Sequence, residues 1–124
     1  METLYISGTD CTPKVVFNSN GTLLMSGRSM PEDVKKFYFV LLDWVVNIEI
    51  DAIHLDMKFE YLNTSSSKEL LELLKCLDSN YKVKDIVINW YYEFDDFDIL
   101  DLGEIYKENL NRVKFNFYEY VEQN

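Results

Sequence analysis

The chain has 124 residues, of which 48% are hydrophobic and 15% aromatic, and its formal net charge is -10. This apolar content favours a folded chain, interpreted as one domain over residues 1–124, and excludes a disordered one. The acidic excess argues against binding to nucleic acid or to an anionic membrane, because both need clustered cations.

The N-terminal segment predicts a short antiparallel unit. One strand is expected at residues 4–7, and two more, at residues 14–17 and 22–25, flank the sequence Asn18-Ser19-Asn20-Gly21. The Asn20-Gly21 pair favours positive φ at both turn positions, which predicts a β-hairpin. Gly27 and its polar neighbours are expected to end the second arm.

A long helix is predicted next, beginning near Ser29. Ser29 is suited to cap this helix, Glu32 can complete a capping box, and Pro31 is tolerated in a first turn. One apolar stripe is expected to face the core, and its members are Val34, Phe37, Leu41, Trp44, Val45 and Ile48.

A second apolar group lies on an adjoining face of the same helix and consists of Phe39, Leu42 and Val46. The helix is therefore apolar over more of its circumference than packing on one sheet requires. Two interpretations stay open. Either another helix covers this group, or the group is a docking surface for a partner.

Three further strands are predicted from alternating patterns at residues 52–62, 85–92 and 113–120. In the first of them the apolar set is Ile53, Leu55, Met57, Phe59 and Tyr61, and the polar set is His54, Asp56, Lys58 and Glu60. Such alternation indicates a sheet that is covered on one face only.

A run of hydroxyl residues at a strand-to-helix junction is the most informative stretch: Asn63-Thr64-Ser65-Ser66-Ser67-Lys68. The helix after it is indicated by the spacing of Leu70, Leu73, Leu74 and Leu77. Either Asn63 or Thr64 is suited to be its N-cap. Because a helix N-terminus stabilises a phosphate, the run is either a phosphorylation switch or an ordinary cap with polar neighbours.

No nucleophile, base and orienting group can be combined into a catalytic site, so we expect no enzyme activity, cofactor or metal. His54, the single histidine, is interpreted as a solvated side chain. The segment 93–110 is expected to contain a helix with the apolar anchors Ile99, Leu102, Ile105, Tyr106 and Leu110. Its acidic run comprises Glu93, Asp95, Asp96, Asp98, Asp101 and Glu104. It lacks the ligand order of a calcium loop and is interpreted as the start of a solvated helix, with contact to a basic partner as the alternative.

The cysteines and the N-terminus favour a cytoplasmic protein. Cys11 and Cys76 have no spacing typical of a zinc site or a redox pair. The first residues do not resemble a secretion signal, and no apolar run is long enough to span a bilayer.

Taken in order, the expected elements read β-β-β-α-β-α-β-α-β. The β-α-β units imply parallel strands with right-handed crossovers, and the hairpin implies an antiparallel part. We therefore predict an α/β fold with a mixed sheet whose helices lie mainly on one face.

Several short motifs occur in order along essentially the whole chain: Gly8-Thr9, Thr12-Pro13, Ser26-Gly27-Arg28-Ser29 with Pro31-Glu32, Leu42-Asp43-Trp44, Tyr61-Leu62 followed by the hydroxyl run, and Asn89-Trp90-Tyr91-Tyr92. Together they resemble the SiaC family of bacterial regulatory phosphoproteins. The Asn-Thr-Ser-Ser block is the most specific of them. The chain departs from the usual family pattern at Met30 and Asp33.

The resemblance implies a fold similar to STAS domains, the anti-sigma-factor antagonists. It also implies that Thr64 is the phosphoacceptor, with Asn63, Ser65, Ser66, Ser67 and Lys68 forming the surface around it. The implied partners are a dedicated kinase, a PP2C-type phosphatase and a diguanylate cyclase that the unphosphorylated form activates. An anti-sigma-factor-antagonist type of partner switch and a small-molecule-binding domain are the alternatives.

Overall fold

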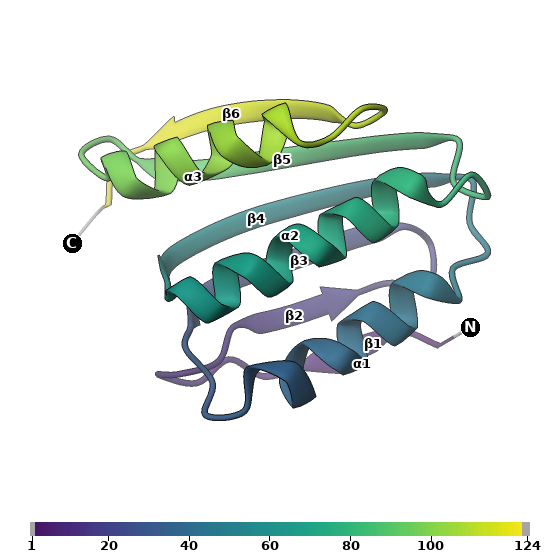
Figure 1. Ribbon diagram of the computed structural model, residues 1–124, viewed down its shortest axis with the longest axis horizontal. Helices are drawn as coiled ribbons and strands as arrows, with labels where there is room; N and C mark the ends of the chain where they lie inside the picture. The colour runs from purple at the N-terminus through teal and green to yellow at the C-terminus, as the bar shows by residue number, and fades with distance from the viewer. Residues whose placement is uncertain (1, 123–124) are drawn as a thin grey trace.

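The computed structural model describes residues 2–122. Six strands form one sheet in the order β1-β2-β3-β4-β5-β6. The strands are β1 (Leu4–Ile6), β2 (Lys14–Phe17), β3 (Thr22–Ser29), β4 (Ala52–Leu62), β5 (Asp85–Glu93) and β6 (Lys114–Tyr120). The helices are α1 (Val34–Val46), α2 (Thr64–Ser79) and α3 (Phe97–Glu108), and all three lie on one face of the sheet (Figure 1). The predicted fold and element order are confirmed.

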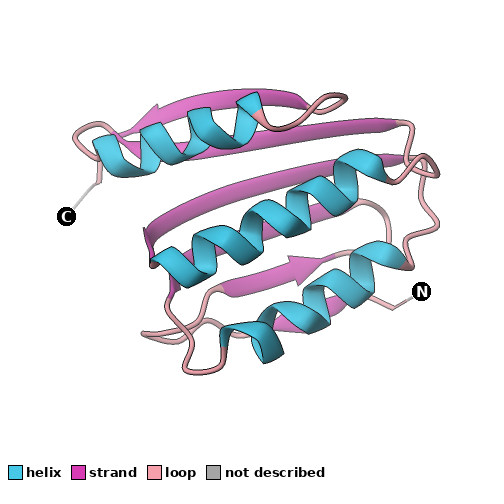
Figure 2. Ribbon diagram, in the orientation of Figure 1, coloured by secondary structure: helices cyan, strands magenta, loops and turns pink. Residues whose placement is uncertain are grey.

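The sheet is mixed, as the sequence predicts. The pairs β1–β2 and β2–β3 are antiparallel, whereas β3, β4, β5 and β6 run parallel to one another. In the parallel part, Met25 lies beside Met57, Met57 beside Trp90, and Trp90 beside Phe117. Because parallel strands end at the same edge, α2 and α3 begin on the same side of the molecule (Figure 2).

The core lies between this sheet and its three helices. Leu55, Met57 and Ile88 are buried on the strands, and Leu73 and Leu74 are buried on α2. These residues belong to the sets that the alternating and helical patterns assign to the core. On β4 the residues that point to the helix-free face, His54, Asp56, Lys58 and Glu60, lie outside the core, so the one-sided cover that the sequence indicates is observed.

The helix-free face carries its own row of polar side chains. Asn89 donates from Nδ2 to Oδ1 of Asp56 at 2.9 Å, and Asn116 donates from Nδ2 to Oδ1 of Asn89 at 3.1 Å. The row crosses β4, β5 and β6, and it satisfies Asn89, which is only 7% exposed. Beside it the Tyr91 and Tyr118 rings stack with centroids 5.2 Å apart.

One member of the β4 pattern is not where the alternation places it. Gly27 lies beside Phe59, but Arg28 lies beside Tyr61, so the register of β3 and β4 shifts by one residue. A bulge of this kind reverses the faces of the residues beyond it. Tyr61 is consequently 42% exposed, and the Arg28 guanidinium lies 5.2 Å from the centroid of its ring. The prediction that Tyr61 faces the core is wrong.

The hairpin is observed, but two of its predicted details are wrong. Only Gly21 has positive φ in the turn, at 97°, and the Asn20 side chain instead accepts a hydrogen bond from the Thr22 N–H at 3.0 Å. Gly27 does not end the second arm, because β3 continues to Ser29 along β4. Gly27 supplies the φ of 101° that this irregular part of the strand adopts.

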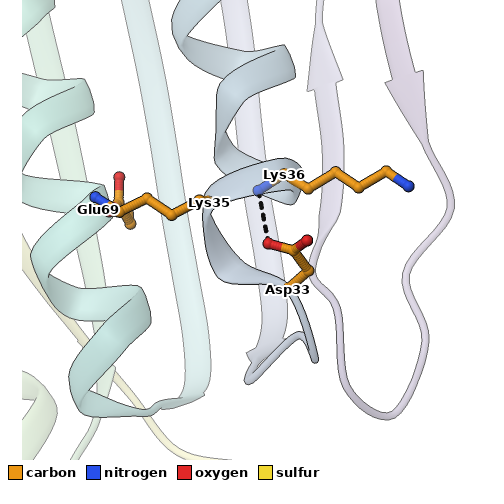
Figure 3. Close-up of polar contacts among 4 residues, drawn as sticks. All are labelled: Asp33, Lys35, Lys36 and Glu69. Carbon is orange, nitrogen blue, oxygen red and sulfur yellow. Dashed lines mark hydrogen bonds and ion pairs between the residues drawn. The ribbon is translucent and has the colours of Figure 1, made fainter.

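The predicted capping box at the start of α1 is also wrong. Ser29 is the last residue of β3 and is buried, so it cannot cap a helix that begins at Val34. The cap is Asp33, whose carboxylate accepts a hydrogen bond from the Lys36 N–H at 3.1 Å (Figure 3). Sheet pairing over the whole of β3 outweighs the local capping preference of a serine.

α3 packs directly on the Trp90 indole through a glycine. A Cβ atom at Gly103 would lie 2.5 Å from Nε1 of Trp90, so a larger residue does not fit there. The indole N–H donates to the Ile99 carbonyl at 2.9 Å, which fixes α3 along β5. This close approach explains a glycine inside a helix, where it is otherwise unfavourable.

Candidate functional site

The hydroxyl run lies at the start of α2, directly after β4. Asn63 is the N-cap, because its Oδ1 accepts a hydrogen bond from the Ser66 N–H at 2.8 Å and its backbone is extended. The Asn63 N–H in turn donates to the Ser29 carbonyl at 3.1 Å, which ties the cap to the end of β3. Thr64 is therefore the first helical residue, and its hydroxyl is free of the capping role.

The four hydroxyl groups of the run have different surroundings. Thr64 and Ser65 are exposed, whereas Ser66 is buried and Ser67 is half-buried. The Ser67 hydroxyl donates back to the Thr64 carbonyl at 2.9 Å. Lys68 is exposed one turn after Thr64. Residues 100° apart around a helix face different directions, which accounts for this sorting.

The buried Ser66 hydroxyl belongs to a hydrogen-bonded series of three hydroxyl groups. Ser29 Oγ donates to Ser66 Oγ at 2.8 Å, and Ser29 Oγ also lies 2.8 Å from the Tyr38 hydroxyl. A serine hydroxyl has a single proton, so the Tyr38 hydroxyl must be the donor to Ser29. Burial raises the pKa of Tyr38, which keeps the phenol protonated for that purpose. The sequence interpretation did not include Tyr38 or this role of Ser29.

A second tyrosine reaches the same turn from α3. The Tyr106 hydroxyl donates to the Ser67 carbonyl at 2.7 Å, and its ring meets the Trp90 ring edge-on at 5.5 Å. Burial raises the pKa of Tyr106, so this phenol is also a permanent donor. Tyr106 was expected as an apolar anchor of α3, and it is buried as such. Its hydrogen bond to α2 was not predicted.

An ion pair joins α1 to α2 close to the hydroxyl run. Within residues 2–122 the one ion pair is that of Lys35 with Glu69, one turn beyond Ser65 (Figure 3). The Lys35 side chain is 82% exposed and that of Glu69 only 9%. The hydrogen bond to Glu69 raises the pKa of Lys35. Because Lys35 is so exposed, the ion pair stabilises the fold little. It does supply a charged partner for the Glu69 carboxylate, which would otherwise be buried without one.

The edge around the hydroxyl run also carries exposed aromatic residues. Tyr61 precedes the run on β4, while Phe94 and Phe97 follow β5 and begin α3. Phe94 is 50% exposed and Phe97 is 67% exposed. Since β4 and β5 are adjacent and parallel, their ends lie at one edge of the sheet (Figure 1). Large exposed apolar side chains grouped in this way are typical of protein-binding surfaces.

The second apolar group of α1 is not covered by another helix. Phe39 is 66% exposed and Val46 is 60% exposed, whereas Leu42 is half-buried. Of the two interpretations open from the sequence, cover by a helix is therefore wrong for Phe39 and Val46. Phe39 and Val46 are therefore exposed apolar residues of α1, while Leu42 packs partly against the core.

The acidic run has structural roles at α3. Asp96 is the N-cap and accepts a hydrogen bond from the Ile99 N–H at 3.1 Å, and Asp98 lies in the first turn. Both positions suit a carboxylate, because the helix N-terminus carries partial positive charge. Of the expected apolar anchors, Ile99 is buried, but Ile105 is 50% exposed. His54 is exposed, in agreement with its interpretation as a solvated side chain.

No group of three or more His, Cys, Asp or Glu side chains within residues 2–122 is arranged to hold a metal ion. None of the helices in that part of the chain combines the length and the apolarity needed to cross a membrane.

Comparison with known proteins gives consistent matches over most of the chain. The family model described as SiaC family regulatory phosphoprotein matches residues 6–120. An uncharacterized protein of Pseudomonas aeruginosa strain UCBPP-PA14 is 30% identical over an alignment of 114 positions, which covers 88% of this chain and 90% of that protein.

Solved structures agree with the family match. The structure of SiaC of Pseudomonas aeruginosa superposes with a TM-score of 0.86 at 27% identity, covering 97% of this chain and 100% of that one. A second match comes from the crystal structure of the diguanylate cyclase SiaD in complex with its activator SiaC, from the same organism. It has a TM-score of 0.85 at 28% identity and covers 94% of this chain and 99% of that one.

Proposed function

This chain belongs to the SiaC family of regulatory phosphoproteins, and we propose that it is a phosphorylation-switched adaptor without catalytic activity of its own. In this proposal the unphosphorylated form binds and activates a diguanylate cyclase, a cognate kinase phosphorylates Thr64, and a PP2C-type phosphatase restores the active form. The support for the cyclase is the similar SiaC chain that is bound to SiaD as its activator. A cytoplasmic location belongs to the same proposal and fits the two free cysteines.

The observation that carries the switch is the placement of Thr64. Its side chain is exposed on the first turn of α2, and the cap function that a threonine often has is performed by Asn63 instead. A kinase can therefore reach the hydroxyl without opening the fold. The phosphate would meet Lys68 one turn further along and the positive end of the helix dipole.

Magnitudes favour a switch that acts by blocking an interface. A phosphate at a helix N-terminus gains only about 0.3–2 kcal/mol from the dipole, and this gain stabilises the helix. Reversing a two-state fold from mostly one form to mostly the other needs about 5.5 kcal/mol. Burying a phosphate in a protein interface costs several kcal/mol, so direct exclusion of the partner requires no change of fold.

Phosphate mapping tests this proposal. The chain is incubated with the kinase and ATP, and its phosphopeptides are sequenced. We expect phosphate on Thr64 and none in Thr64→Ala, while Ser65→Ala is modified like the wild type. The free energy of unfolding of Thr64→Ala should lie within about 0.5 kcal/mol of the wild-type value, because the threonine hydroxyl does not cap α2. Phosphate on another residue in the wild type would contradict the assignment.

Affinity capture identifies the partner. We expect the unphosphorylated chain to retain a diguanylate cyclase from a lysate of its own organism and to raise the activity of the purified cyclase. Capture of a regulator of a sigma factor instead would favour the anti-sigma-factor-antagonist type of switch. Loss of capture after kinase treatment is expected in either case.

The exposed apolar residues Phe39 and Val46 of α1 offer a second surface for the partner or for self-association. We expect Phe39→Asp and Val46→Asp to weaken association by at least about tenfold, because each places a charge on an exposed apolar group. Both variants should keep the wild-type unfolding transition, with Ser19→Asp in the exposed turn between β2 and β3 as a charge-matched control. Unfolding of both would assign the group to the core, and unchanged association would remove it from any interface.

A further inference from the structure

The hydroxyl run contains four hydroxyl groups with the chemistry of a phosphate acceptor, and they differ in how exposed they are. Ser66 is 0% exposed, while Thr64 and Ser65 are open to solvent. Phosphorylation at Thr64, as proposed above, thus depends on how firmly the first turn of α2 is held. Rotation of that turn about its axis would bring a different hydroxyl to the surface.

Two buried phenols hold this turn from opposite sides. From α1, the Tyr38 hydroxyl donates through Ser29 to Ser66 Oγ, with both hydrogen bonds at 2.8 Å. From α3, the Tyr106 hydroxyl donates to the Ser67 carbonyl at 2.7 Å. Tyr38 is 0% exposed and Tyr106 is 1% exposed, so water does not replace either donor. The two residues they hold are consecutive.

The geometry points to Tyr38 and Tyr106 as positioning residues of the switch: together they fix the first turn of α2 so that Thr64 is presented to the kinase in one orientation while Ser66 and Ser67 are withheld from it. This inference rests on the proposed phosphorylation of Thr64 and adds the reason for its selectivity. Neither tyrosine contacts the phosphoacceptor hydroxyl. Each acts through the neighbouring serine that it holds.

The direction of the hydrogen bonds makes the two arms independent. Tyr38 acts on a side chain, since its hydroxyl donates a hydrogen bond to Ser29 and the Ser29 hydroxyl donates one to Ser66. Tyr106 acts on the backbone, since the Ser67 carbonyl is its acceptor. Removing one phenol hydroxyl therefore leaves the other arm in place, and removing both should release the turn.

The test uses Tyr38→Phe, Tyr106→Phe and the double variant, each of which deletes only hydroxyl groups. Tyr118→Phe is the matched control, because its ring lies on the helix-free face against Tyr91. Amide hydrogen exchange measures how often the first turn opens. We expect exchange of the Ser66 and Ser67 amides, which donate to Asn63, to accelerate about threefold to tenfold in each single variant and further in the double variant, since one hydrogen bond contributes about 0.5–1.5 kcal/mol.

Kinase treatment supplies the readout that a purely structural role would not change. In the wild type and in Tyr118→Phe, phosphate is expected on Thr64 only. In the double variant, a measurable share is expected on Ser66 or Ser67, with a lower kcat for Thr64. Wild-type exchange rates together with phosphate confined to Thr64 would overturn the inference.

The outcomes separate this inference from the proposed function. If the wild-type chain accepts no phosphate on Thr64, the proposed function fails, and the exchange rates still decide whether the tyrosines hold the turn. If the double variant does not unfold cooperatively, the two single variants decide the question. Normal Thr64 modification of the wild type with no redistribution in the folded variants leaves the proposed function intact and rejects the role of the tyrosines.

Discussion

Thr64→Glu should fold as stably as the wild type and lose affinity for the diguanylate cyclase by about 100-fold or more, a change of about 2.8 kcal/mol. The side chain is exposed at the first position of α2, where a carboxylate gains about 0.3–1 kcal/mol from the helix dipole. In the complex the same carboxylate would lose its water without gaining a partner, which costs several kcal/mol.

The neutral variant Thr64→Gln is the control for size. We expect it to bind more tightly than Thr64→Glu, because it adds bulk without charge. Isothermal titration against the purified cyclase measures all three proteins, and thermal melts verify their folds. A Thr64→Glu protein that binds like the wild type would remove Thr64 from the interface and with it the blocking mechanism.

Leu73→Ala should lower the free energy of unfolding by about 2–5 kcal/mol. Leu73 is fully buried on α2 between the sheet and its neighbours, so truncation leaves a cavity that the surrounding side chains fill only in part. Leu74→Ala should cost a similar amount for the same reason. Urea denaturation of both variants and the wild type gives the differences directly.

Leu71→Ala is the internal control, because Leu71 lies on the same helix but is only partly buried. Its loss should be clearly smaller than that of either neighbour. Losses below half a kcal/mol for both Leu73→Ala and Leu74→Ala would mean that α2 does not contribute to the core. In that event the first turn of α2 would lack the rigid support that a positioned phosphoacceptor requires.

The alternation of residues 52–60 correctly predicted which side of the sheet is covered, because side-chain period and burial are linked directly in a strand. The pattern fails at Tyr61, because Gly27 and Arg28 of β3 pair with Phe59 and Tyr61 and leave Glu60 as an extra residue in β4. A bulge depends on how two strands pair, and no single strand sequence reveals it. Ser29 illustrates the same limit, since its pairing along β4 overrides a local capping signal.

The site was predictable to the extent that it depends on α2 itself. Ser66 precedes Leu70 by four residues and Leu73 by seven, so helical periodicity already places it on the buried stripe. Periodicity does not predict which residues form hydrogen bonds with this turn. Ser29 is 37 residues away in the chain and Tyr106 is 39 residues from Ser67, and only the tertiary fold brings them to the turn.

The helical periodicity of α1 also predicts that Tyr38 is buried, although the sequence interpretation did not include it. Tyr38 stands three residues before Leu41 and seven before Val45, in line with two residues of the expected core stripe. A tyrosine on such a stripe is buried with a hydroxyl that needs a partner. Phe39, the next residue, was correctly separated from that stripe, and it is exposed.

The sequential strand order has a consequence for how the molecule is synthesised. Every strand pairs with the strand that precedes it in the chain, so the sheet can grow by one strand at a time from the N-terminus as translation proceeds. α2 can pack once β4 has joined β3, but the Ser67 carbonyl must wait for Tyr106, which belongs to the last helix. The turn that carries Thr64 is thus completed near the end of synthesis, and we expect a nascent chain that lacks α3 to be a poor substrate for the kinase.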